Sequence, residues 1–343
     1  MSHILQPDSQ LDDWVTEQNL PAFRAAQIRR WLFASRAESF AEMTNLPLPL
    51  RTELEGAFQW WTSHVAAHKQ AEDGTEKLLL EFSDQQKIEC VLLREAERRT
   101  ICISTQVGCG MGCVFCASGL DGVVRNLTAG EIIEQMLRLR RLMPEEERIS
   151  HIVVMGMGEP LANLENLLAA LKVAASSEGL GISPRRMTIS TVGLPAAMRR
   201  LSQAGSQYNL AVSLHAANDT LRNELVPVNA KSGLEAILAA ADEYFEASGR
   251  RLTFEYVLLG GVNDREQDAQ QLATRLRSRS ALLNLIPYNP VAGLPYRTPT
   301  EDAVARFSTV LTAQGVNVQI RRRKGSRIDA ACGQLRRMPA TTA

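Results

Sequence analysis

Three cysteines lie close together in one short glycine-containing stretch of the chain. Cys109, Cys113 and Cys116 have the spacing Cys-x3-Cys-x2-Cys, and Phe115 immediately precedes the last of them. Three thiolates on such a loop can hold three irons of a cubic iron–sulfur cluster and leave the fourth iron without a protein ligand. An iron with an open coordination site can bind and activate a small molecule, so the spacing predicts catalysis rather than structure alone.

A zinc site and a disulfide framework both fit this loop less well. A structural zinc site usually needs four protein ligands in two pairs, and no second cysteine pair is present, because Cys90, Cys102 and Cys332 are scattered. Six cysteines in 343 residues are sparse for a disulfide framework, and the first residues lack the apolar core of a signal peptide. We favour a metal cluster over zinc, and zinc over a chance group of thiols, and we expect a cytoplasmic protein.

The composition is that of an ordinary globular protein, with 45% hydrophobic and 22% charged residues. No apolar run approaches the roughly 20 residues that span a bilayer, so we expect no membrane partner. We also expect the protein to be a monomer. The net charge of zero does not by itself indicate a nucleic-acid partner. Local basic groups are present, and they are Arg321–Lys324, Arg327, Arg336, Arg337 and, near the N-terminus, Arg29, Arg30, Arg36 and Arg51. Such groups usually form a solvated face, and contact with an RNA backbone is the more specific interpretation.

Hydrophobic periodicity predicts a helical segment over residues 10 to about 70, and then a hairpin of strands at 77–82 and 87–93. A strand at 100–106 leads into the cysteine loop. Strands and helices then alternate, with strands at 151–155, 187–190, 210–214, 252–259, 282–286 and 316–320, and helices at 132–143, 164–176, 194–204, 234–247, 265–277 and 301–313. This alternation predicts an α/β fold, a closed or partly open β/α barrel whose site lies at the C-terminal strand ends.

Polar residues and glycines follow these strands where a barrel site is expected. Gly156 and Gly158 would allow a ligand close to the backbone, and Glu159 would accept a hydrogen bond from an ammonium group. Side chains suited to hydroxyl or carboxylate contacts, or simply placed at the same rim, are Ser190, Ser213, His215, Asn263 and Asn289. Each could serve an ordinary structural purpose alone, but their shared placement favours a binding pocket.

The cysteine spacing and the segment Gly156–Pro160 resemble the motifs of the radical S-adenosylmethionine superfamily. Longer segments resemble the RlmN/Cfr family of RNA adenosine methyltransferases, and they are Gln106–Cys109, Met155–Pro160, Ser213–Ala216, Leu285–Pro290, Ile328–Leu335 and, in its accessory domain, Phe23–Ala25 and Glu42–Thr44. The resemblance covers nearly the whole chain. It implies a partial (β/α)6 radical-SAM barrel over residues 101–322. It also implies an N-terminal helical, RNA-binding accessory domain (1–72), a β-hairpin extension (73–100) and a C-terminal segment (323–343), of which we expect the last residues to be disordered.

The resemblance also implies roles for individual residues. Cys109, Cys113 and Cys116 would hold a [4Fe–4S] cluster whose open iron chelates S-adenosylmethionine. The rest of that pocket would be Gly158, Glu159, Ser190, Ser213, Leu214, His215 and Asn289. Cys332 would be methylated first, Cys102 would be the resolving cysteine, and Glu89 stands at the position of the family's proton acceptor. Cys90 is left without a role.

The implied reaction is methylation of adenine carbon 2, which has no acidic hydrogen and therefore needs a radical route. Two molecules of S-adenosylmethionine would be consumed, and Cys102 and Cys332 would end as a disulfide. The implied substrates are 23S ribosomal RNA in its peptidyl-transferase region and an adenosine beside the anticodon of tRNAs, with a flavodoxin- or ferredoxin-type electron donor. The alternatives are methylation at carbon 8, a non-catalytic iron–sulfur RNA-binding protein, and a radical enzyme acting on a peptide or small molecule.

Overall fold

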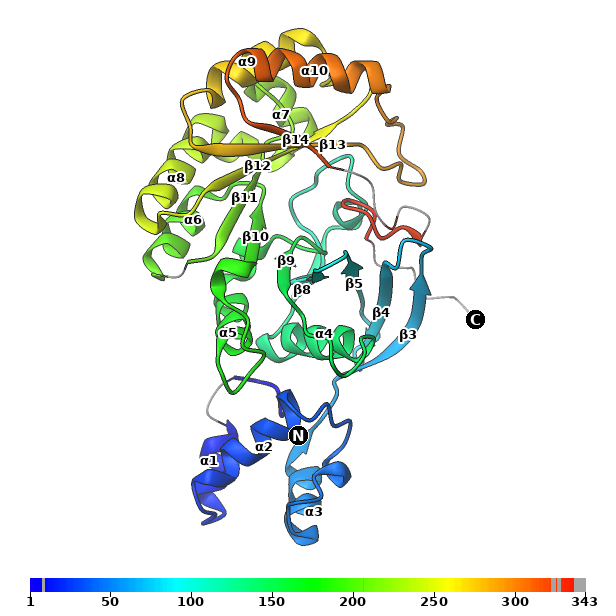
Figure 1. The fold of residues 1–343 in the computed structure, drawn as a ribbon, viewed down its shortest axis with the longest axis vertical. Coiled ribbons are helices and arrows are strands. Elements are labelled where there is room, and N and C mark those ends of the chain that lie inside the picture. Colours follow the sequence, from blue (N-terminus) through cyan, green and yellow to red (C-terminus); the bar gives the residue numbers. More distant parts are fainter. Residues whose placement is uncertain (8–9, 206, 322–324, 326–327, 336–343) are drawn as a thin grey trace.

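The structure is a computed structural model that describes residues 1–7, 10–205, 207–321, 325 and 328–335. The N-terminal region is mainly helical, with β1 (Ser2–His3), α1 (Gln10–Glu17), α2 (Phe23–Phe33), the 3-10 turn η1 (Phe40–Glu42), α3 (Leu48–Ala57) and β2 (Phe58–Gln59). Ile28, Leu32 and Leu54 are buried between its helices, as amphipathic periodicity requires. This region lies beside the barrel rather than within it (Figure 1).

The main sheet, within the described residues, is one open, strongly curved surface. Its strands are β3 (Ser63–Gln70), β4 (Glu76–Phe82), β5 (Lys87–Arg94), β6 (Arg99–Cys102), β9 (His151–Val154), β10 (Met187–Thr191), β11 (Asn209–Ser213), β12 (Leu252–Leu258), β13 (Ala281–Pro287) and β14 (Val318–Ile320). Their order is β14-β13-β12-β11-β10-β9-β6-β5-β4-β3. The strands from β6 to β14 in this order are parallel, and β3 to β6 are antiparallel neighbours. The predicted partial barrel is therefore confirmed.

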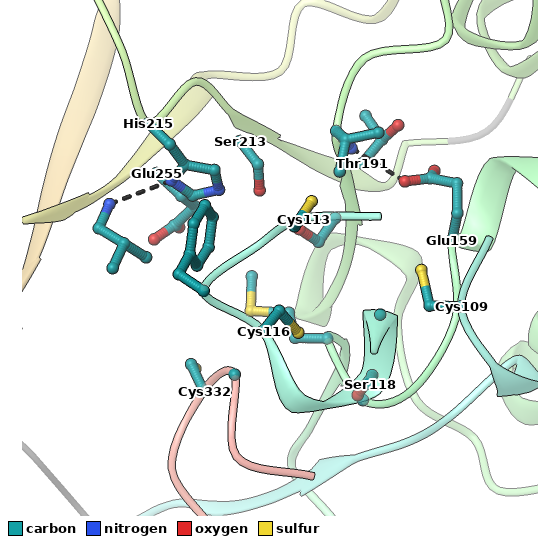
Figure 2. Close-up of a pocket in the computed structure, with 18 of the residues that line it drawn as sticks. Cys109, Cys113, Cys116, Ser118, Glu159, Thr191, Ser213, His215, Glu255 and Cys332 are labelled. Carbon is teal, nitrogen blue, oxygen red and sulfur yellow. Dashed lines mark hydrogen bonds between the residues drawn. The ribbon is translucent and has the colours of Figure 1, made fainter. Parts of the chain in front are cut away.

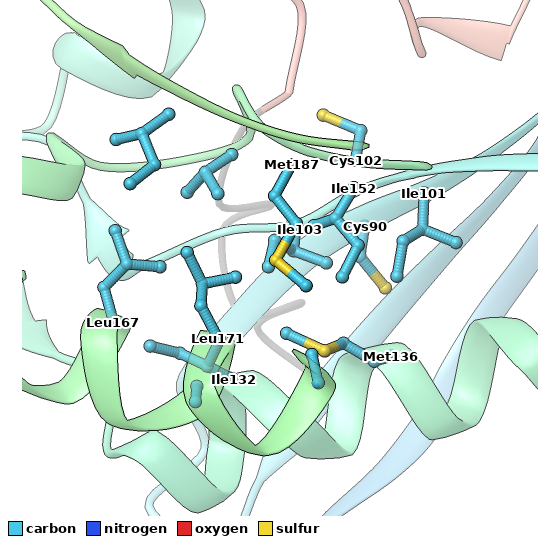
Figure 3. Packing of buried hydrophobic residues seen from close by; sticks show 14 of the residues in the cluster. Cys90, Ile101, Cys102, Ile103, Ile132, Met136, Ile152, Leu167, Leu171 and Met187 are labelled. Atoms are coloured by element: carbon cyan, nitrogen blue, oxygen red, sulfur yellow. The ribbon is translucent and has the colours of Figure 1, made fainter. Parts of the chain in front are cut away.

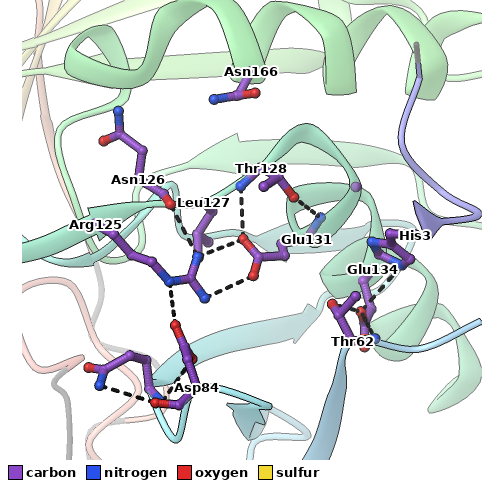
Figure 4. Close-up of polar contacts among 12 residues, drawn as sticks. His3, Thr62, Asp84, Arg125, Asn126, Leu127, Thr128, Glu131, Glu134 and Asn166 are labelled. Carbon is purple, nitrogen blue, oxygen red and sulfur yellow. Dashed lines mark hydrogen bonds and ion pairs between the residues drawn. The ribbon is translucent and has the colours of Figure 1, made fainter. Parts of the chain in front are cut away.

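Helices cover the outer face of the parallel strands (Figure 1). They are α4 (Ala129–Arg141), α5 (Leu164–Ala175), α6 (Pro195–Gln203), α7 (Asp219–Leu225), α8 (Gly233–Ser248), α9 (Glu266–Leu276) and α10 (Glu301–Ala313). A capping box opens α4, as its sequence predicts: Glu131 N donates to Thr128 Oγ1, and Thr128 N donates to the Glu131 carboxylate. Arg125 contacts both that carboxylate and Asp84 (Figure 4). None of the described helices is long and apolar enough to cross a bilayer.

Three local predictions differ from the structure. Residues 63–70 are not helical but form β3, which pairs with β4, so the expected boundary at residue 72 separates two paired strands. β3 is an edge strand on which six of eight side chains are exposed, so its sequence carries no apolar alternation. The strand expected at 100–106 divides into β6 and β7 (Gln106–Gly108), which pairs with β8 (Val123–Asn126). Helix α7 was not expected at all.

Arginines hold the N-terminal region against the barrel in both directions. Arg36 donates hydrogen bonds to the carbonyls of Met143, Pro144, Glu145 and Glu147, just after the C-terminus of α4. In return, Arg140 and Arg141 of α4 donate to carbonyls that follow α2, those of Phe33, Ala34, Arg36 and Ala37. Cations suit the carbonyl-rich C-termini of helices. Arg36, one of the basic residues considered above for contact with RNA, therefore attaches the N-terminal region to the barrel.

A buried carboxylate adds a second attachment. Glu134 of α4 is fully buried and accepts hydrogen bonds from the backbone and hydroxyl groups of both Thr62 and Ser63 (Figure 4). Arg138 pairs with the same carboxylate. A buried charge is tolerated only when its hydrogen-bonding capacity is used in this way. The chain between the N-terminal region and β3 is thus fixed to the barrel.

Cys90 and Cys102 face opposite sides of the sheet. Cys90 is completely buried on the helix side, near Met136 of α4, whereas Cys102 points to the concave side (Figure 3). The register explains this, because Val91, not Cys90, is the partner of Cys102 on the neighbouring strand. Cys90 is therefore a core residue.

Candidate active site

The C-terminal ends of the parallel strands surround a cavity of about 150 Å³. Sequence-predicted residues that border it are Cys109, Cys113, Cys116, Gly158, Glu159, Ser190, Ser213, His215 and Cys332. They come from the loop after β7, the loop after β9, β10, the end of β11 and the C-terminal segment. Parallel strands place their carboxyl ends at one rim, so residues far apart in sequence meet here.

The cysteine loop is held from two sides. Val114 N donates to Leu225 O at the end of α7, and Cys109 N donates to Gly122 O. The Phe115 ring meets His215 edge-on, with 4.9 Å between ring centroids. The aromatic residue of the motif thus packs the loop onto the strand-end histidine, and the three cysteines line the cavity (Figure 2).

The donor set suits a polynuclear cluster better than a single ion. All three cysteines are free thiols, and burial raises the pKa of each, that of Cys109 to about 12. Within the described residues, no three Cys, His, Asp or Glu side chains lie close enough together to hold one metal ion. His64 and His68 have a zinc-like spacing but belong to β3, where they contact Glu81 and Glu76. Thiols set around a cavity fit a cubic cluster and argue against mononuclear zinc.

The loop after β9 is shaped by its glycines. A Cβ on Gly156 would lie 2.6 Å from Ser104 Oγ, and one on Gly158 would lie 2.6 Å from Gln106 Cβ. These glycines therefore let the loop pack against residues 103–106, and they also border the cavity, so the ligand approach expected from sequence stays a prediction. The Glu159 carboxylate accepts hydrogen bonds from Leu161 N (3.0 Å) and Val192 N (2.9 Å), and burial raises its pKa.

Replacing Gly158 with alanine is expected to destabilise the fold by about 1–3 kcal/mol, because φ is +97° and the new methyl group would overlap Gln106. Gly293→Ala is a matched control: its φ is +88°, but nothing lies within 4 Å of the added Cβ. Urea unfolding of both variants separates backbone strain from overlap. Equal losses in the two variants would contradict the overlap.

His215 is fixed in a neutral form. Its φ of +62° is unusual for a residue with a side chain, and Asn263 Nδ2 donates to its carbonyl (2.8 Å). Val257 N donates to His215 Nδ1 (3.1 Å), which leaves the hydrogen on Nε2. Burial, assisted by the charge of Arg222, lowers its pKa to about 3. His215 therefore offers a neutral N–H donor at the cavity.

Arg222 lies behind the cavity and ties the strand ends together. It is completely buried in α7. Its guanidinium donates to the carbonyls of Leu214 (2.9 Å), Ser213 (2.8 Å) and Val192, and to Asn229 Oδ1. Sequence reasoning missed this residue because an arginine in a short helix normally faces solvent. It is buried because α7 packs against the strand ends, whose carbonyls its guanidinium contacts.

The C-terminal segment reaches the cysteine loop through backbone contacts. Ala117 N donates to Gly333 O (2.8 Å), and Ser118 Oγ donates to Leu335 O. Asn289 Nδ2 donates to Cys332 O (3.4 Å). Cys332 is therefore held beside the loop (Figure 2). Residues 322–324, 326, 327 and 336–343 lie outside the described residues, and with them the basic residues Arg322–Lys324, Arg327, Arg336 and Arg337 and the expected disordered end. Arg29 and Arg51 are described, and they contact Asp12 and the carbonyl of Ala41.

A second cavity of about 580 Å³ lies against the concave face of the sheet. Cys102 and Cys332 both border it, and so does Asn289, which does not border the first cavity. Leu214 borders neither, because its side chain is buried and its backbone N donates to Glu255 O. Five residues border both cavities, and they are Met155, Glu255, Ile286, Arg321 and Cys332.

Glu89 borders neither cavity but is connected to the C-terminal segment. Its carboxylate pairs with Lys77 Nζ at 2.8 Å, and both side chains are buried. Lys77 Nζ also donates to Asp329 O (2.9 Å), three residues before Cys332. Glu89 lies two residues from Val91, so both face the concave side of the sheet.

Comparisons with known proteins agree with this geometry. Residues 103–273 match the radical SAM superfamily, and residues 6–59 match the ribosomal RNA large subunit methyltransferase N-terminal domain. A probable dual-specificity RNA methyltransferase RlmN of Rhodopirellula baltica is 64% identical over 96% of this chain and 88% of its own length. One of Symbiobacterium thermophilum is 45% identical over 95% of this chain and 89% of its own. The chain belongs to the RlmN family of radical SAM RNA methyltransferases.

The RlmN family accounts for both parts of the fold. A radical SAM methyltransferase from Sphaerobacter thermophilus, 39% identical, superimposes with a TM-score of 0.95 over 98% of this chain and 99% of its own. The N-terminal match ends at residue 59, before β3, which belongs to the sheet. As a radical SAM enzyme of the RlmN family, the protein uses S-adenosylmethionine and an iron–sulfur cluster. The family resemblance seen in the sequence is thus confirmed.

Proposed function

We propose that this enzyme methylates carbon 2 of an adenosine in 23S ribosomal RNA, and of an adenosine beside the anticodon of tRNAs, through a methylated cysteine. The observation that carries the proposal is the position of Cys332, which borders both the cavity of the three cysteines and the cavity of Cys102. A methyl carrier must reach a methyl donor on one side and an acceptor on the other. The dual-specificity RNA methyltransferases among the relatives support two classes of RNA.

Cys109, Cys113 and Cys116 are the proposed ligands of a [4Fe–4S] cluster. When bound, this cluster supplies the electron that cleaves S-adenosylmethionine and thereby starts radical chemistry. Gly158, Glu159, Ser190, Ser213, Leu214, His215 and Asn289 are the proposed contacts of S-adenosylmethionine. For most of them the support is that they border the first cavity, whereas Leu214 would act through its backbone and Asn289 from the second cavity.

Cys332 is the proposed first methyl acceptor. Its thiolate attacks the methyl carbon of the sulfonium, so the S–CH3 bond to the protein forms as S-adenosylhomocysteine leaves. The radical derived from a second S-adenosylmethionine then removes a hydrogen atom from this methyl group, and the resulting methylene carbon bonds to carbon 2 of adenine, which afterwards loses its proton and one electron. Cys102 next attacks the Cys332 sulfur. The carbon–sulfur bond breaks with its electron pair on carbon, which takes up a proton, and a disulfide forms that must be reduced before the next turnover. Both cysteines are free thiols here and border the same cavity.

Glu89 and Cys102 are the two proposed acceptors of the proton lost from adenine carbon 2. The Glu89 carboxylate contacts Lys77 Nζ at 2.8 Å, and the same Nζ donates to Asp329 O in the segment that carries Cys332. Burial, with a smaller contribution from Cys332, raises the pKa of the Cys102 thiol to about 12, so its thiolate is a strong base once formed. Glu89→Gln and Cys102→Ser should therefore each slow release of the RNA from Cys332, which gel mobility of the protein–RNA adduct measures.

The methylation of Cys332 is expected to accelerate with pH. The Cys332 side chain faces the two cavities, where its desolvation raises the pKa of this thiol while Arg321 opposes the rise. Below that pKa the thiolate fraction grows about tenfold per pH unit. Intact-protein mass spectrometry of Cys332 methylation between about pH 7 and pH 8 measures the slope. Arg321→Met should slow the step at each pH, with Arg98→Met as a charge-matched control on the second cavity. A flat profile would contradict thiolate attack.

Anaerobic reconstitution with labelled S-adenosylmethionine and ribosomal RNA, followed by nucleoside mass spectrometry, tests the proposal. We expect 2-methyladenosine. Detection of 8-methyladenosine would instead support the alternative, methylation at carbon 8. Absence of any methylated nucleoside would favour a non-catalytic iron–sulfur RNA-binding protein. The flavodoxin- or ferredoxin-type donor, the monomeric state and the cytoplasmic location stay predictions.

A further inference from the structure

The second cavity is large enough for a nucleoside and is not occupied by protein groups of the cluster loop. Its volume of about 580 Å³ lies within the range of about 300–1,000 Å³ typical of small-ligand pockets. None of the three loop cysteines is among the described residues that border it, whereas Cys102 and Cys332 both are. A base that reacts at Cys332 and is released by Cys102 must enter this cavity.

Glu255 stands where the two cavities meet. It lies on β12, whose alternate residues Thr253, Glu255 and Val257 face the concave side. Thr253 borders only the second cavity, Val257 only the first, and Glu255 both. Among the described residues shared by the two cavities, it is the one carboxylate, and Cys332 is another of them.

One carboxylate oxygen of Glu255 accepts a hydrogen bond and the other accepts none from the described residues. Asn284 Nδ2 on the neighbouring strand donates to Oε1 (2.9 Å), and the register pairs these two residues directly. Oε2 accepts no hydrogen bond within the described part of the chain, although only 4% of the residue is exposed. Arg321 Nη1 is 3.8 Å from Oε2, too far for a hydrogen bond but close enough to stabilise the negative charge.

A buried acceptor without a partner is costly, so its presence at a cavity indicates a donor on the ligand. An ionised carboxylate only accepts hydrogen bonds. Adenine presents a donor, its 6-amino group, whereas guanine and hypoxanthine present an acceptor, O6. Asn284, the partner of Oε1, borders the second cavity alone, whereas Arg321, the cation beside Oε2, borders both cavities.

We infer that Glu255 Oε2 accepts a hydrogen bond from the 6-amino group of the substrate adenine, and that Glu255 thereby selects adenine over 6-oxopurines. This inference rests on the proposed function, because it needs an adenosine in the second cavity. Asn284 holds the carboxylate in place. Burial raises the pKa of Glu255, and the positive charge of Arg321 opposes that rise and so favours the ionised form. Selection of this kind is strong because a mismatched base leaves a buried charge unpaired or facing another acceptor.

The test compares Glu255→Gln with the unaltered enzyme on RNA whose target adenosine is kept or replaced by purine riboside or inosine. Single-turnover methyl transfer of the unaltered enzyme should fall roughly 10- to 100-fold for purine riboside, which lacks the amino group, and further for inosine. On adenosine, the rate of methyl transfer by Glu255→Gln should fall by a similar factor relative to the unaltered enzyme. On purine riboside, the substitution should lower the rate little further. The variant should also discriminate less against inosine, because an amide can donate a hydrogen bond to O6. Glu165→Gln, the same change at an exposed site, should keep the selectivity of the unaltered enzyme.

Two further measurements separate this role from others. The iron content and the Kd for S-adenosylmethionine of Glu255→Gln should equal those of the unaltered enzyme. A weakened Kd for S-adenosylmethionine together with unchanged base selectivity would assign Glu255 to the methyl donor and overturn the inference, while the proposed function would stand. An unaltered enzyme that methylates no adenosine in any RNA would overturn both.

Discussion

Replacing Cys332 with alanine is expected to abolish methylation of RNA while leaving the protein folded and able to bind iron. The residue is exposed to the two cavities and lies outside the hydrophobic core, so its loss removes no packing. The segment keeps the hydrogen bonds that its carbonyls accept, at Gly333 O from Ala117 N and at Asp329 O from Lys77 Nζ. Without a sulfur at this position no methyl group can be carried between the cavities.

Labelled methyl transfer to RNA, measured beside iron content and the brown absorbance of the reconstituted protein, tests this expectation. Cys90→Ala is the matched control, because Cys90 lies on the other face of the sheet, borders neither cavity and should retain methyl transfer. An active Cys332→Ala variant would refute the methyl-carrier mechanism. Loss of iron from it would instead assign Cys332 a role in holding the cluster.

Replacing Arg222 with methionine should destabilise the fold by about 3–5 kcal/mol and reduce iron retention. The substitution keeps much of the volume but leaves the carbonyls of Val192, Ser213 and Leu214 buried without their donor. Those carbonyls follow the strands that present Ser190, Ser213 and His215, and α7 also supports the cysteine loop through Leu225 O. The site should therefore loosen together with the fold.

Urea unfolding of the apo-protein measures the stability change, and iron per chain after anaerobic reconstitution measures the effect on the site. Arg200→Met is the control: Arg200 pairs with Glu165 at the surface, where such pairs contribute under about 1 kcal/mol. If both variants lose the same stability, the buried hydrogen bonds of Arg222 do not hold the strand ends.

The sequence was sufficient to place those residues whose positions depend on local spacing and strand position. The cysteine spacing, the capping box of α4 and the alternation of strands and helices are local patterns, so the barrel and most rim residues could be predicted. Arg222 and Glu255 could not. Arg222 resembles an ordinary helical surface residue until α7 packs on the loop, and Glu255 interrupts an apolar strand whose inner face turns out to border cavities.

The same contrast between local sequence patterns and long-range packing explains where the observed fold differs from the predicted one. β3 is predominantly exposed and, in the part of the chain that the structure describes, pairs with β4 alone, so hydrophobic periodicity gave no sign of a strand. For the two glycines after β9, ligand approach stays a prediction, and the structure adds a reason that the local sequence does not carry: an added Cβ would overlap residues 103–106. Long-range contacts, not local propensity, decide both cases.

The reciprocal arginine contacts between α2 and α4 have a consequence for substrate choice. With Arg36, Arg140, Arg141 and the buried Glu134 all engaged across one junction, the N-terminal helices cannot pivot freely on the barrel. An RNA that touches both these helices and Cys332 must therefore bridge a fixed span. The enzyme would then select RNAs by distance. It would accept those whose folded shape places an adenosine at the fixed separation between the N-terminal helices and Cys332, and reject those that do not.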